Sequence, residues 1–144
     1  MINQKIFLSH KGANKLIVRD TSKILKTLGF QPWLDEEAML AGANLEREIL
    51  EGMRRSCAAV FFVTSDFVDD NFLATEIEYA IQQKRAKKER FAIITMILPG
   101  KDGKKGTAPD LLRSYVWKEP ENDIQMIDEI IKALPIKPSG ITWI

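Results

Sequence analysis

The chain has 144 residues, 45% of them hydrophobic and 28% charged, a composition typical of one soluble globular domain with a single core. Its formal net charge of +1 gives no strong overall field toward nucleic acid or an anionic membrane, and its longest apolar run, FAIITMIL, is too short to span a bilayer. With one cysteine and one histidine, the sequence excludes an intramolecular disulfide and disfavours a metal site of cysteine and histidine ligands, so we expect a cytoplasmic domain without a bound metal.

Short apolar runs alternate along the chain with segments of helical spacing. We predict strands at KIFLS (5–9), FQPWLD (30–35), CAAVFFVTS (57–65), FAIITMILPG (91–100) and SYVWK (114–118). The third and fourth runs are almost continuously apolar, which is typical of parallel strands covered on both faces. Pro32 marks the second strand as an edge strand or a bulged one.

Four segments have helical periodicity, at residues 15–29, 44–56, 69–81 and 123–134. The third runs on into a basic segment, KRAKKER (84–90), which is typical of a solvated helix end. Residues 100–110 have the composition of a polar loop, and the tail 134–144 has no assigned element. Strands that alternate with helices predict one α/β domain over residues 1–144, whether or not it is part of a longer protein. We expect an open, mostly parallel five-stranded sheet with helices on both faces.

Ligands of open parallel sheets bind beyond the carboxyl ends of the strands, and the third predicted helix begins at that end. Glu76, in the first turns of this helix, therefore lies near a potential cleft. Helical periodicity does not separate it from Glu78, because both flank the apolar arc formed by Leu73, Ile77, Ala80 and Ile81. The pattern alone favours two solvated surface glutamates over a working carboxylate.

Other catalytic patterns are weaker. The sequence contains neither GxGxxG after a strand nor GxxxxGK[ST], and the serine in VTSDF lacks the glycines of a nucleophile elbow. His10 is the one available histidine base, but a structural role in closing the first strand is favoured over a catalytic one. The basic run at 84–90 has no interleaved aromatic residues, so we expect no direct contact with nucleic acid.

Four segments resemble, in order and spacing, the sequence boxes of the TIR (Toll/interleukin receptor) domain family: KIFLSH, PWLDEEAMLAGANLEREI, SCAAVFFVTSDFV and FLATEI. The resemblance covers the chain from about Lys5 to Leu134 and implies a flavodoxin-like fold. It also implies that the loop before the second helix is a self-association element, with Glu36, Leu40, Gly42 and Asn44 as its assembly residues.

Many prokaryotic members of that family cleave NAD+ at the nicotinamide–ribose bond, often as effectors of anti-phage immunity. The resemblance places the family's catalytic glutamate at Glu76 and gives Glu78 no role. NAD+ would then be the substrate, with no separate cofactor. Phe72 and Leu73 stand where the family usually has tryptophan and cysteine. The residues that the resemblance implies around the substrate are His10, Lys11, Trp33, Asp35, Leu45, Ser65 and Phe72.

The implied partners are NAD+ and other TIR domains, with a homo-oligomer formed on activation and no membrane contact. Two further functions compete with an NAD+-cleaving enzyme. One is a non-catalytic TIR–TIR interaction module, although such members often lack the glutamate found here at position 76. The other is a flavodoxin-like binding or receiver domain, which would require acidic residues after the first strand, where the sequence reads FLSHKG.

Overall fold

The computed structural model of the chain describes residues 5–9, 15–34, 41–65 and 71–136, with only the backbone described at 15 and 71–73. Within these ranges five strands form one sheet in the order β2-β1-β3-β4-β5, and each neighbouring pair is parallel. The predicted open parallel sheet is confirmed. Its strands are β1 (Lys5–Ser9), β2 (Gln31–Trp33), β3 (Ala58–Val63), β4 (Ala92–Ile97) and β5 (Trp117–Lys118).

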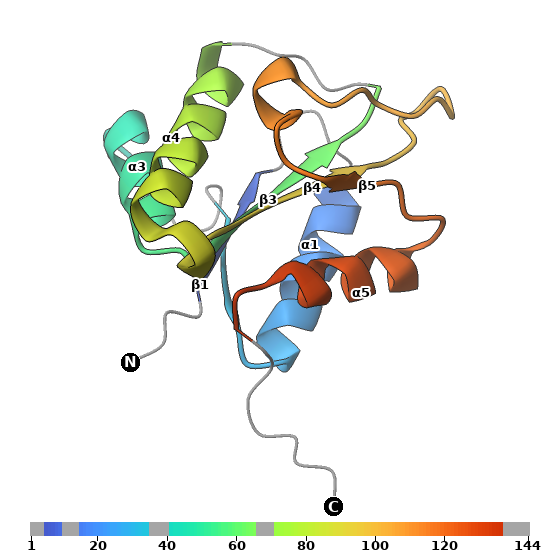
Figure 1. The fold of residues 1–144 in the computed structure, drawn as a ribbon, viewed down its shortest axis with the longest axis horizontal. Coiled ribbons are helices and arrows are strands. Elements are labelled where there is room, and N and C mark those ends of the chain that lie inside the picture. Colours follow the sequence, from blue (N-terminus) through green and yellow to red (C-terminus); the bar gives the residue numbers. More distant parts are fainter. Residues whose placement is uncertain (1–4, 10–14, 35–40, 66–70, 137–144) are drawn as a thin grey trace, which may run out of the picture.

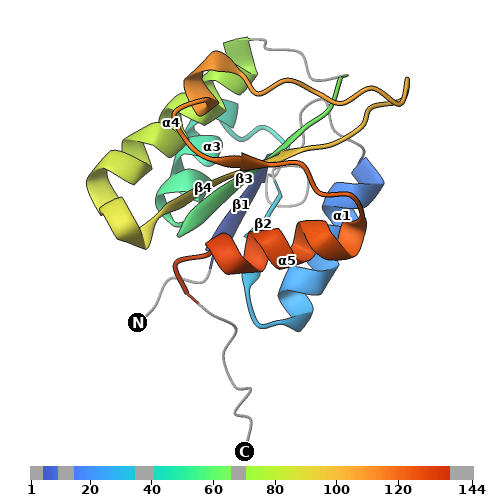
Figure 2. The same ribbon diagram turned by 45° about the vertical axis from the view of Figure 1, so that its right-hand side comes forward.

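Helices cover both faces of this sheet, as Figures 1 and 2 show. One face carries α1 and α5, and the other carries α3 and α4. The described α-helices are α1 (Lys15–Thr27), α3 (Leu45–Arg54), α4 (Asn71–Lys87) and α5 (Asp123–Ala133), and two short 3₁₀ helices are η1 (Lys88–Arg90) and η2 (Asp110–Leu112). None of the helices in the described part of the chain has the length and apolar character needed to cross a membrane.

The alternation of side chains along the strands divides the core into two layers. In β1, Ile6 and Leu8 pack against α1 and α5, whereas Phe7 packs against α3 and α4. All six residues of β3 are buried, because helices cover the strand on both sides. This burial confirms that the continuous apolar run marks a central parallel strand.

Four of the five strands are shorter than the runs predicted, and the second and fifth are shortened by half or more. The second is limited to Gln31–Trp33 and lies at the edge of the sheet, where Pro32 removes no hydrogen bond from a central ladder. The fifth was predicted at residues 114–118, but only Trp117 and Lys118 pair with β4. Val116 is 80% exposed, so this apolar side chain is not buried by the sheet as a strand prediction implies.

Candidate functional site

Glu76 is a buried carboxylate at the carboxyl end of the sheet. It lies in the second turn of α4 with 1% of its surface exposed, whereas Glu78 on the same helix is exposed. Ile77 and Ala80 pack into the adjacent core layer and fix this part of α4 against the sheet. Burial of a carboxylate is costly unless hydrogen bonds compensate for the lost water, so Glu76 is not an ordinary surface residue placed to suit the helix dipole.

The last residue of β1 supplies one of these hydrogen bonds. Ser9 Oγ donates to Glu76 Oε2 over 2.7 Å, and Ser9 itself is 3% exposed. Ser9 faces α4 because side chains alternate along β1, and Phe7 two residues earlier points into the layer beneath α3 and α4. The hydrogen bond thus joins two segments 67 residues apart and sets the orientation of the Glu76 carboxylate.

Sequence reasoning assigned no role to Ser9. The available signal was its position as a polar residue that closes an otherwise apolar strand, on the same side of the strand as Phe7. That signal predicts the face of the sheet on which Ser9 lies. It does not predict Glu76 as the hydrogen-bond partner, because this requires knowing that α4 crosses the same face.

Ser65, predicted to border the ribose, is exposed just after β3 and bonds to the loop that follows β4. Its Oγ donates to Asp102 Oδ1 over 2.7 Å, and the Lys104 backbone N–H donates to the same oxygen over 3.0 Å. The Ser65 hydroxyl, followed by the Lys104 N–H, lowers the pKa of Asp102 below its usual value. This contact and an isolated bridge between Thr64 and Lys105 fold the loop back over the end of β3.

Trp33, predicted near the substrate, packs against the core at the end of β2. Its ring stacks on Phe7 with centroids 5.1 Å apart and an interplanar angle of 16°. The other side of the indole lies against Gly52 of α3, where an added Cβ would meet Trp33 Cε2 at 2.7 Å. The indole therefore fills the space between β1 and α3, while the side chain remains partly exposed.

We expect the Gly52→Ala variant to unfold at a lower temperature than the wild type. The new methyl group overlaps a rigid ring, and overpacking of this kind typically costs about 1–3 kcal/mol, more than the roughly 1 kcal/mol that alanine gains over glycine inside a helix. Thermal unfolding followed by circular dichroism measures the difference. The double variant with Trp33→Phe, which has a smaller ring, should recover part of the loss. A higher melting temperature for Gly52→Ala alone would contradict this packing.

The other predicted positions fall partly within the described ranges. Gly42 has φ +86°, and no neighbouring atom lies within 4 Å of the point that a Cβ would occupy. Asn44 caps α3 by accepting a hydrogen bond from the Arg47 N–H over 3.0 Å. Leu45, predicted near the nicotinamide, is 45% exposed at the start of α3. Phe72 lies in the first turn of α4, where only the backbone is described. The predicted residues outside the described ranges are His10, Lys11, Asp35, Glu36 and Leu40.

The described residues contain no group of three or more histidine, cysteine, aspartate or glutamate side chains that could hold a metal ion. Within the described residues, a parallel α/β sheet carries one buried carboxylate, Glu76, at its carboxyl end. This is the arrangement of an α/β domain with a ligand site at the ends of its strands.

The chain belongs to the TIR domain family, whose sequence model matches residues 6–131. It is 33% identical over 82 residues to a probable 2′ cyclic ADP-D-ribose synthase, TcpO, of Methanobrevibacter olleyae, a match that covers 54% of this chain and 24% of that protein. It is 31% identical over 72 residues to the 2′ cyclic ADP-D-ribose synthase BtTIR of Bacteroides thetaiotaomicron, which covers 49% of this chain and 25% of that protein. The chain thus spans about a quarter of the length of the curated relatives that it matches.

Proposed function

We propose that this TIR domain cleaves NAD+ at the nicotinamide–ribose bond and that Glu76 is its catalytic carboxylate. The observation that carries the proposal is the buried Glu76 carboxylate, held by the Ser9 hydroxyl at the end of the sheet where α/β domains bind ligands. Membership of the TIR family supports it, as do the names of the two relatives, both cyclic ADP-ribose synthases.

A single carboxylate suits this reaction. Most glycosidases need a general acid because their leaving group has to be protonated. The nicotinamide ring of NAD+ is already cationic and departs as a neutral molecule, so no acid is required. The remaining task is to stabilise the positive charge that develops on the ribose as the bond to nicotinamide breaks. A preoriented carboxylate in a largely water-free position does so by its charge and by accepting hydrogen bonds from the ribose hydroxyls.

The product depends on which nucleophile then reaches the anomeric carbon. Attack by water gives linear ADP-ribose, whereas attack by a hydroxyl of the same molecule, which loses its proton, gives a cyclic ADP-ribose that contains one water less. The names of both relatives favour the cyclic product. Intramolecular capture needs a folded substrate and the exclusion of water, because a hydroxyl held in place competes with solvent through its high effective concentration.

The proposal includes activation by self-association in the cytoplasm, within an antiviral response. The loop that ends at Asn44 would contact a second copy, and two described features support this. Leu45 exposes 45% of its surface directly after the loop, and Gly42 takes a left-handed conformation that glycine adopts without strain. In such an assembly the neighbouring copy would complete the substrate pocket.

The test is to incubate NAD+ with the purified chain over a series of protein concentrations and to measure released nicotinamide by chromatography and the second product by mass spectrometry. We expect nicotinamide release, with a specific rate that rises with protein concentration. A cyclic product has the mass of ADP-ribose less one water. No release at any concentration, with self-association retained, would instead identify the domain as a non-catalytic interaction module.

A further inference from the structure

Cationic side chains gather where α3 and α4 end, at the amino end of the sheet and opposite to Glu76. Each of these helices joins two parallel strands, so its last turn returns to the amino end of the sheet. Figure 1 shows the two helices side by side on one face. We call the cluster the basic end. Its cations are Arg54, Arg55, Lys84, Arg85, Lys87, Lys88 and Arg90, and its carboxylates are Glu51 and Glu89.

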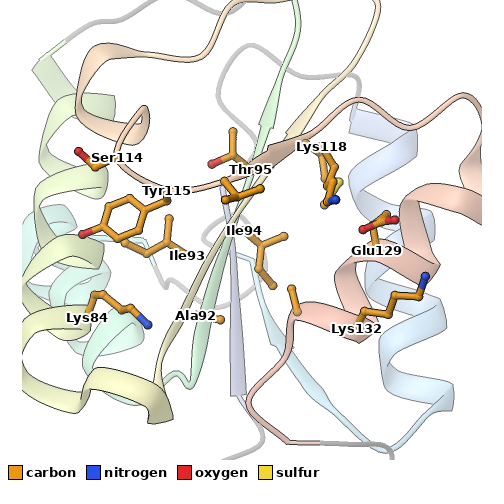
Figure 3. Close-up of a pocket in the computed structure, with 13 residues that line it drawn as sticks. Lys84, Ala92, Ile93, Ile94, Thr95, Ser114, Tyr115, Lys118, Glu129 and Lys132 are labelled. Atoms are coloured by element: carbon orange, nitrogen blue, oxygen red, sulfur yellow. The ribbon is translucent and has the colours of Figure 1, made fainter.

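Lys87 joins the two helices within the basic end. Its Nζ donates to the Arg54 carbonyl over 2.6 Å and to the Ser56 carbonyl over 2.9 Å. Lys84 Nζ donates to the Phe91 carbonyl over 2.9 Å, and Figure 3 shows this side chain reaching from α4 toward the start of β4. The ends of α3 and α4 therefore form one surface, although the residues that Lys87 joins to Arg54 are 33 positions apart in the sequence.

The basic end concentrates positive charge on a nearly neutral protein. Its seven cations and two carboxylates give a formal charge of +5, whereas the whole chain carries +1, so the remaining residues carry −4. Burial, followed by repulsion from Arg90 and Arg54, lowers the pKa of Lys87 below its usual value, against the attraction of Cys57. The basic end thus produces a local positive field that the net charge of the chain does not reveal.

These charges are only partly neutralised. The exposed cations that form no ion pair within the described residues are Arg85, Lys88 and Arg90. Glu51 pairs with Arg54 over 2.6 Å and with Arg55 over 3.8 Å, and all three side chains are open to solvent. Exposed pairs of this kind are weak, so a phosphate group can compete for either guanidinium.

Lys88 occupies a backbone position that does not favour lysine. It follows the last residue of α4 and has φ +54°, the one positive φ among the described residues other than glycines. A left-handed residue after a helix is usually glycine, which adopts this conformation without strain. The fold therefore accounts for the conformation of Lys88 but not for its residue type, and the lysine adds a charge at an exposed position.

Helix dipoles account for part of the basic end. Cations in the last turn of a helix are stabilised by the carbonyl groups there, and Arg54 and Arg85 lie in such turns. The effect falls off within that turn, whereas Arg90 comes three residues after the end of α4. The dipoles therefore leave Arg90 and the residue type at position 88 unexplained.

We propose that the basic end binds the phosphate backbone of double-stranded nucleic acid without reading its sequence. The exposed cations are mostly arginines, whose planar guanidinium groups bind phosphates through two parallel hydrogen bonds. None of the large apolar side chains exposed in the described part of the chain lies in the basic end. The surface thus has no such group to insert into a bilayer or to stack on the bases of a single strand, and duplex phosphates require neither.

The prediction of no contact with nucleic acid rested on the absence of aromatic residues from 84–90. That absence argues against single strands, whose bases stack on aromatic side chains, but not against duplexes. The inference does not depend on the proposed reaction, because Glu76 lies at the opposite end of the sheet and stays accessible. Copies bound along one duplex lie close together, and their high local concentration favours the self-association proposed for activation.

The test is to titrate a fluorescein-labelled DNA duplex of about 20 base pairs with the purified chain and to follow fluorescence anisotropy, with a Kd of about 10⁻⁶–10⁻⁴ M expected at physiological salt. The logarithm of the binding constant should fall with the logarithm of salt concentration with a slope of about −3 to −5, which corresponds to three to five neutralised phosphates. An RNA duplex and a DNA duplex of unrelated sequence should bind with similar affinity, because phosphate contacts carry no sequence information.

The double variant Arg85→Glu, Arg90→Glu should bind the duplex roughly tenfold more weakly or less, with a salt slope reduced by about 2. Lys88→Gly should reduce the slope by about 1 and keep or raise the melting temperature, because glycine suits the left-handed backbone. The matched control is the double variant Lys23→Glu, Lys26→Glu, which makes the same change of net charge at two exposed positions of α1. It should change the affinity less than about twofold.

Three results would overturn the proposal. The first is no change of anisotropy at low salt with about 10⁻⁴ M protein. The second is equal weakening by the α1 control, which would mean that binding follows net charge and not this surface. The third is binding to phosphatidylserine vesicles without binding to either duplex, which would identify an anionic membrane as the partner of the basic end.

Discussion

Replacing Glu76 by glutamine is expected to lower the rate of nicotinamide release from NAD+ by about 10²–10³-fold or more, the usual effect of removing a group that stabilises transition-state charge. The carboxamide has nearly the same size as the carboxylate, and its oxygen can still accept the hydrogen bond that Ser9 Oγ donates. The change therefore removes the negative charge while it keeps this hydrogen bond. Initial rates at saturating NAD+, measured by chromatography of released nicotinamide, give the comparison.

Stability separates a catalytic role for Glu76 from a structural one. A buried charge opposes folding unless its partners compensate fully, so the Glu76→Gln variant should melt at the same temperature as the wild type or higher. The matched control is Glu78→Gln, an exposed position two residues further along α4, which should change the rate less than about twofold, as surface substitutions usually do. Retained activity in Glu76→Gln, or an equal loss in both variants, would exclude Glu76 as the catalytic carboxylate.

The sequence alone predicted the sheet well because its central strands carry an unambiguous pattern. The runs that became β3 and β4 are apolar almost throughout, the pattern typical of a parallel strand that is buried on both faces. The fifth strand was predicted too long because Tyr115, Val116 and Trp117 suit a strand by residue type. Val116 is nevertheless 80% exposed. Whether such a segment pairs with β4 depends on the course of the loop that leads into it. The β-propensity of its residues does not describe that course.

The site was harder to predict because its defining contact is not local. Glu76 and Glu78 occupy equivalent boundary positions on a helical wheel, and nothing in the surrounding sequence separates them. The family resemblance selected Glu76. The physical difference between the two is that α4 passes over the end of β1, where the Ser9 hydroxyl lies.

Replacing Ser9 by alanine is expected to lower kcat for NAD+ cleavage roughly 10- to 100-fold with little change in KM, because a carboxylate that loses its orienting donor spends less time in the reactive geometry. Ser9 does not need to contact the substrate for this effect, so it is a positioning residue. Ser9→Thr retains a hydroxyl on a residue that suits a strand, and it should restore most of the rate. Steady-state kinetics of the three proteins separate kcat from KM.

Ser56→Ala provides the matched control for the loss of a buried serine hydroxyl. Ser56 is fully buried at the opposite end of the sheet, before β3, and its Oγ donates to the Gly52 carbonyl over 2.7 Å. Both alanine variants should lose about 1–3 kcal/mol of unfolding free energy in urea titrations, because each leaves a buried acceptor without its donor. Only Ser9→Ala should also lose activity, since only Ser9 bonds to Glu76. An equal fall in kcat for the two variants would mean that the rate follows general stability, and the Ser9–Glu76 hydrogen bond would then have no specific part in catalysis.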